Sequence, residues 1–124
     1  MRAAVAVACF IGHEQLITHG PLRAHAIYDF VPGILRHFDA EAVPGLIAPR
    51  ALLALTGDSD PTSPPGGVRM LESKLKRTDS LYQAPERFRS VICPDTGHRY
   101  LPEMKREMAA WLERWPRAGP DARK

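Results

Sequence analysis

Three short apolar runs predict the buried strands of this chain. They cover residues 1–10, 51–56 and 88–93, and Gly or Pro residues lie close to the ends of the second run. A continuous apolar run is typical of a parallel strand that is covered on both faces. The third run also contains Arg89 and Ser90, which favours a position near the edge of the sheet.

Two segments repeat apolar residues at helical spacing. The first predicts a helix over about residues 67–82, with Val68, Leu71, Leu75 and Tyr82 on one face. The second predicts a last helix that Pro102 begins and Pro116 stops. Its apolar positions step by three and four and are Leu101, Met104, Met108, Trp111 and Trp115. Residues 11–46 are rich in His, Gly and Pro, which predicts an irregular connection with short helices near 34–38 and 40–46.

This order of elements predicts an α/β fold with a partial open sheet of three mainly parallel strands and flanking helices. One domain is expected over residues 1–116, with residues 117–124 as a flexible tail. The composition of the 124 residues, 44% hydrophobic and 25% charged, excludes disordered and fibrous classes. Part of the net charge of +3 lies in the last turns and the tail, so we expect no nucleic-acid binding. No apolar run approaches the ~20 residues of a membrane helix, so we expect no membrane binding.

The first ten residues also fit a signal peptide, because an apolar core follows Arg2. A single cation and the lack of a clear cleavage site favour the buried strand, and with it a cytoplasmic location. Cys9 and Cys93 both lie in apolar runs, where buried, reduced thiols are expected.

Candidate chemistry gathers after the second and third predicted strands. Asp58 and Asp60 follow the second strand, and Asp95 and His98 follow the third. Loops that leave the carboxyl ends of parallel strands meet at one edge of the sheet. An acid beside a histidine suits a nucleophilic hydrolase, since the histidine acts as a general base and the carboxylate fixes its tautomer. A capping aspartate and a surface histidine fit these residues equally well.

Several motifs occur together in a characteristic order. They are His19-Gly20, His25, Val31-Pro32-Gly33, Ile47-Ala48-Pro49-Arg50, Gly57-Asp58-Ser59-Asp60-Pro61 and Gly97-His98. In these motifs the chain resembles the carboxyl-terminal half of an α/β-hydrolase of the dienelactone-hydrolase-like or acetyl-xylan-esterase-like kind. The resemblance implies a serine-type carboxylic ester hydrolase, with Asp60 as the catalytic acid and His98 as the catalytic histidine. It also places His19 and His25 near a pocket for a small ester substrate.

The chain departs from that family in one respect. The family needs a nucleophile on a Gly-x-Ser-x-Gly turn, and the 124 residues contain no such turn. We therefore expect a hydrolase fragment that is inactive alone, its nucleophile being on a missing amino-terminal half or a separate segment. Self-association is a second expectation, because the first strand would expose an edge. A non-catalytic, hydrolase-like binding module is the alternative function.

Other assignments have less support. Ser59 could serve as a nucleophile with Asp95 and His98, but Pro61 stands where the turn needs glycine. Cys9 lies in an apolar run that is more typical of a core than of a nucleophile turn. His13, His19 and His25 recur every six residues, which is not the spacing of a helical ligand pair. We expect no metal and no cofactor.

Overall fold

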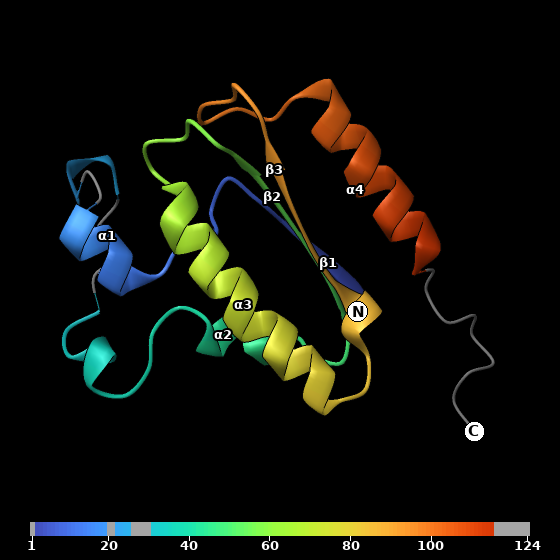
Figure 1. The fold of residues 1–124 in the computed structure, drawn as a ribbon, viewed down its shortest axis with the longest axis horizontal. Coiled ribbons are helices and arrows are strands. Elements are labelled where there is room, and N and C mark those ends of the chain that lie inside the picture. Colours follow the sequence, from blue (N-terminus) through green and yellow to red (C-terminus); the bar gives the residue numbers. More distant parts are fainter. Residues whose placement is uncertain (1, 20–21, 26–30, 116–124) are drawn as a thin grey trace.

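The computed structural model describes residues 2–19, 22–25 and 31–115. Its centre is a three-stranded parallel sheet of β1 (Ala3–Val7), β2 (Ala51–Gly57) and β3 (Phe88–Cys93), in the order β1-β2-β3. Helices α3 (Pro65–Leu81) and α4 (Pro102–Arg114) lie on opposite faces of the sheet (Figure 1). The predicted fold class is thus confirmed. The expected tail, residues 117–124, lies outside the described residues.

Strand β2 is the centre of the core, and all seven of its residues are buried. Because side chains alternate along a strand, β2 supplies both layers of the protein. Leu52 and Ala54 join the cluster formed with α3, which contains Val68, Leu71 and Leu75. Leu53 and Leu55 join the cluster formed with α4. The continuous apolar run that predicted this strand therefore reflects burial on both faces.

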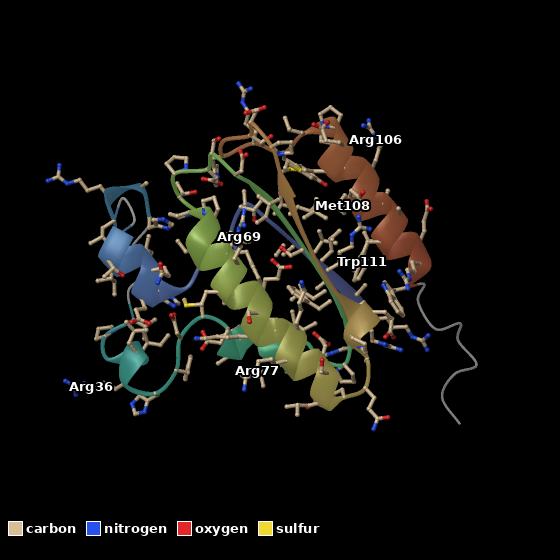
Figure 2. The ribbon with its side chains drawn as sticks, in the orientation of Figure 1. Arg36, Arg69, Arg77, Arg106, Met108 and Trp111 are labelled. Carbon is tan, nitrogen blue, oxygen red and sulfur yellow. The ribbon has the colours of Figure 1, made fainter. Side chains whose placement is uncertain are left out.

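The α4 layer contains both tryptophans of the chain. Trp111 is buried beside Met104, and it lies on the side of α4 that faces the strands (Figure 2). The ring of Trp115 meets that of Trp111 edge to face, with 5.9 Å between the ring centroids. The guanidinium groups of Arg87 and Arg114 lie 4.9 and 5.2 Å from the centroid of the Trp115 ring. Arg87 belongs to the short 3-10 helix η4 (Pro85–Arg87) before β3, so these contacts fix the end of α4.

The connection from β1 to β2 contains a helix that the sequence pattern did not predict. Helix α1 (His13–His19) lies in a segment expected to be irregular. Asp39 explains the difference, because its carboxylate accepts the N–H groups of His13 at 2.6 Å and Glu14 at 3.2 Å. This cap comes from far along the chain, so no local pattern signals it.

The short helices of the same connection differ in extent from those predicted. The structure has 3-10 helices η1 (Leu22–Ala24) and η3 (Ile34–Arg36), and α2 (Ala42–Gly45). The last two lie within the segments predicted near residues 34–38 and 40–46.

Three other expectations can be compared with the structure. Strand β3 does lie at an edge of the sheet, and its Arg89 pairs with Glu107 of α4 at 3.1 Å. The prediction that Tyr82 lies on the buried face of the helix is wrong, because α3 ends at Leu81 and Tyr82 is 56% exposed. Cys93 is buried as expected, whereas Cys9 is exposed because β1 ends at Val7 and the chain turns at Ala8 (φ 51°).

Strand β1 forms the other edge of the sheet. Its residues pair in parallel with Ala51–Leu55 of β2, and no strand of the described residues pairs with its second side. All five side chains of β1 are alanine or valine and are half-buried. An uncharged, apolar edge strand presents unpaired backbone groups to which another strand can add.

Glycine is required where β2 ends. A Cβ atom on Gly57 would lie 2.0 Å from the carbonyl oxygen of Thr96, which is backbone and cannot rotate away. The loops after β2 and β3 therefore touch backbone to backbone at this point.

We predict that Gly57→Ala destabilises the protein severely, by more than about 3 kcal/mol, because the two loops must separate to admit the methyl group. Urea unfolding followed by circular dichroism measures the change. Gly66→Ala is the control, since nothing lies within 4 Å of its added Cβ. It should be neutral or slightly stabilising. Equal stability of the two variants would contradict the close approach.

We predict that Asp79→Asn stabilises the protein near neutral pH. Asp79 of α3 is 5% exposed, and its Oδ1 has no hydrogen-bond partner among the described residues. Burial and the nearby charge of Glu86 raise the pKa of Asp79. Its ionised form therefore costs stability above the folded pKa. Removing the charge should gain about 1 kcal/mol at pH 7 and less as the pH falls. Thermal melts at pH 7 and pH 4 test this, and a loss of stability at pH 7 would contradict it.

Candidate active site

The loops after β2 and β3 begin side by side. Gly57 and Cys93, the last residues of the two strands, are register partners, and the strands are parallel. The N–H of Asp58 donates to the carbonyl of Cys93, and the N–H of Ser59 donates to that of Thr96, both at 3.0 Å. The carboxylate of Asp58 accepts the N–H of Thr96 at 3.2 Å. Asp58 therefore joins the two loops.

Asp60 and His98 meet across this joint. Oδ2 of Asp60 lies 3.0 Å from Nδ1 of His98. The side chain of Asp60 is fully buried, whereas that of His98 is 58% exposed. The expected contact between the two loops is thus present, and it involves Asp60 rather than Asp58.

Thr62 completes the arrangement, although it is not among the residues predicted from the sequence. Its N–H and its hydroxyl donate to Oδ1 of Asp60 at 2.8 and 2.7 Å. Its Oγ1 also lies 2.9 Å from Nδ1 of His98. A side-chain oxygen that bonds the N–H two residues later is an Asx-turn, so the spacing in Asp60-Pro61-Thr62 could have signalled this role.

These bonds determine the ionisation of Asp60 and the tautomer of His98. Burial raises the pKa of Asp60, but the two bonds from Thr62 and the contact with His98 outweigh it, and the pKa lies below its ordinary value. An ionised Asp60 can only accept, so Nδ1 of His98 must carry the hydrogen. In the neutral ring Nε2 is then the nitrogen with the free lone pair, and it can act as a general base.

A pocket of about 410 Å³ adjoins His98. Its other lining residues come from the end of β1 and the turn after it, from the loop before α4 and from the middle of α4: Val7, Ala8, Arg99, Tyr100 and Met108. The Tyr100 hydroxyl donates to the sulfur of Met108 at 2.9 Å. The exposed histidine therefore stands beside the edge strand β1, at the end of the sheet where the loops converge.

Two of the remaining candidate residues, Ser59 and Asp95, do not join this site. The hydroxyl of Ser59 donates to Asp58 at 2.9 Å, and Asp95 is exposed. His25 is half-buried, and the described lining of the pocket beside His98 does not include it. The side chain of His19 lies outside what the structure describes. Within the described ranges no three His, Cys, Asp or Glu side chains gather as a metal site would require, and no helix is long and apolar enough to cross a membrane.

Comparison with known proteins supports a hydrolase-like fold. No model of a known protein family matches the chain. Over 105 residues the chain is 31% identical to "Putative hydrolase YtaP" of Bacillus subtilis (strain 168). The matched residues make up 85% of this chain and 35% of that protein. The chain thus spans about a third of the length of this relative.

A solved structure gives the same fold. The "Methylesterase BT1017" matches with a TM-score of 0.52 and 23% sequence identity, over 60% of this chain and 16% of that one. At this identity the match concerns the fold, a parallel sheet flanked by helices.

We predict that Asp60→Asn lowers the free energy of unfolding at pH 7 by about 1–3 kcal/mol, because it removes the charged acceptor of a buried network. The depressed pKa of Asp60 stabilises the fold above its unfolded pKa, and this contribution is lost as the pH falls through the folded pKa. The difference between the two proteins should therefore shrink below pH 4. Urea titrations from pH 7 to pH 3 measure it. Asp95→Asn, in an exposed loop position, is the control and should differ little from the unmodified chain at any pH. A difference that does not depend on pH would contradict the ionised state of Asp60.

Proposed function

We propose that this chain supplies the acid and base of a serine-type carboxylic ester hydrolase of the dienelactone-hydrolase-like or acetyl-xylan-esterase-like kind. The contact between Asp60 and His98 carries the proposal, since it combines a buried, ionised acid with an exposed imidazole. Similarity to a putative hydrolase and the fold shared with a methylesterase support it. The substrate would be a small ester, and no cofactor or metal is involved in this reaction.

The roles of the two residues follow from their hydrogen bonds. Nε2 of His98 removes the proton of a serine hydroxyl as that oxygen attacks the ester carbonyl, and later returns it to the leaving alcohol. Asp60 holds Nδ1–H, so that Nε2 is available, and stabilises the imidazolium ion that forms. Thr62 orients Asp60 through its two bonds to Oδ1. We also propose that His19 and His25 help to shape the substrate pocket.

The nucleophile has to come from outside these 124 residues, which lack a Gly-x-Ser-x-Gly turn. We propose that the segment carrying it adds to the free side of β1. That strand has unpaired backbone groups, and its end lines the pocket beside His98. A strand added there in parallel would end close to the imidazole. Without that segment the same edge is expected to drive self-association of the chain.

Hydrolysis of p-nitrophenyl acetate tests the proposal. We predict that the chain alone is no faster than its His98→Ala variant. When the chain is mixed with the part of the related putative hydrolase that the match does not cover, it should gain activity. Asp60→Asn should reduce that activity by about 10⁴-fold through loss of the correct tautomer. Ser59→Ala, whose hydroxyl only meets Asp58, is the matched control and should retain the activity.

Two results would contradict the proposal. Turnover by the chain alone that disappears in Ser59→Ala would make Ser59 the nucleophile. A stable complex with the added segment that has no esterase activity, and that forms equally well with Asp60→Asn, would favour the alternative of a non-catalytic binding module.

A further inference from the structure

The structure contains a second histidine–aspartate pair, separate from Asp60 and His98. Nδ1 of His13, at the start of α1, is 3.1 Å from Oδ1 of Asp39. The carboxylate also accepts the backbone N–H groups of His13, Glu14 and Ala40. Burial raises the pKa of Asp39, but these bonds outweigh it, so the acid is held ionised. Because an ionised Asp39 can only accept, Nδ1 of His13 carries the hydrogen, and in the neutral ring Nε2 is an acceptor.

This histidine borders a pocket of about 550 Å³, which is within the range of small-molecule sites. Its walls are mainly aliphatic, from Leu16 and Ile17 of α1 and from Val31 and Leu35 around η3. Ile17, Val31 and Leu35 are each more than 40% exposed, so the pocket opens to solvent. Such a cluster of exposed aliphatic side chains costs free energy unless something covers it.

Among the described lining residues, Arg36 carries the permanent charge, and no acidic side chain is among them. Arg36 projects from η3 at the outer margin of the molecule (Figure 2), and its guanidinium forms no hydrogen bond or ion pair with another described residue. An aliphatic interior with a cationic rim complements a molecule that has an apolar tail and an anionic head.

We propose that the pocket between α1 and η3 binds an aliphatic carboxylate, with its tail among Leu16, Ile17 and Val31 and its head group on Arg36. A guanidinium recognises a carboxylate through paired N–H donors. Among the described residues, the pocket beside His98 shares no lining residue with this one. The proposal is therefore independent of the proposed ester hydrolysis.

Calorimetric titration of the full chain with octanoate tests this proposal. We expect saturable binding, with octan-1-ol and octylamine at least tenfold weaker because each lacks the negative charge. Arg36→Gln should weaken octanoate binding about tenfold. Arg77→Gln is the matched control: Arg77 is an exposed arginine of α3 that is not part of the pocket, and its loss should have no effect.

A second pair of variants tests the apolar wall. Ile17→Glu puts a charge into the pocket and should abolish binding, whereas Leu81→Glu, at an exposed position on α3 outside the pocket, should not. His98→Ala should leave octanoate binding unchanged. The proposal is overturned if octanoate does not bind saturably, if octan-1-ol binds as tightly, if the two arginine variants behave alike, or if His98→Ala removes binding.

Discussion

The close approach of two backbones at Gly57 and Thr96 determines what the candidate site can be. Only a residue without a side chain admits the Thr96 carbonyl at that position. Once the loops touch there, Asp58 bonds the N–H of Thr96, and Asp60 is carried to the inner side of the same turn. The distance from Asp60 to His98 is therefore a result of backbone packing, which explains how an exposed imidazole can keep a fixed partner.

Two neighbouring carboxylates on this turn have different tasks. Asp58 bonds backbone and a serine hydroxyl, and holds the loops together. Asp60 is enclosed, and its oxygens are shared between Thr62 and His98. A similar division separates the two histidine–aspartate pairs of the molecule. Asp39 mainly caps helix α1, and its contact with the His13 ring is secondary. The backbone hydrogen bond of Asp60 stays within its own turn.

Much of the fold could be predicted from the sequence, because the apolar runs and the helical spacing report burial directly. β2 and α4 illustrate this. The side chains of α4 that pack against the sheet are the ones that its apolar pattern predicts to face inward. α1 could not be predicted, because its cap, Asp39, is distant in the sequence. In the site, the residues Asp60 and His98 came from motif order, while the role of Thr62 depends on a turn whose geometry only the structure gives. The exposure of Cys9 likewise depends on where β1 ends.

The pairing of the two tryptophans affects how this protein can be observed. Both indoles of the chain lie within one edge-to-face contact at the end of α4, and two arginines flank the outer ring. Intrinsic fluorescence and the near-ultraviolet dichroism of the indoles therefore report the docking of α4 on the sheet. These signals do not report on the opposite layer. A rearrangement of α1 and the loops around η3, or ligand binding between them, could therefore leave the tryptophan signal unchanged.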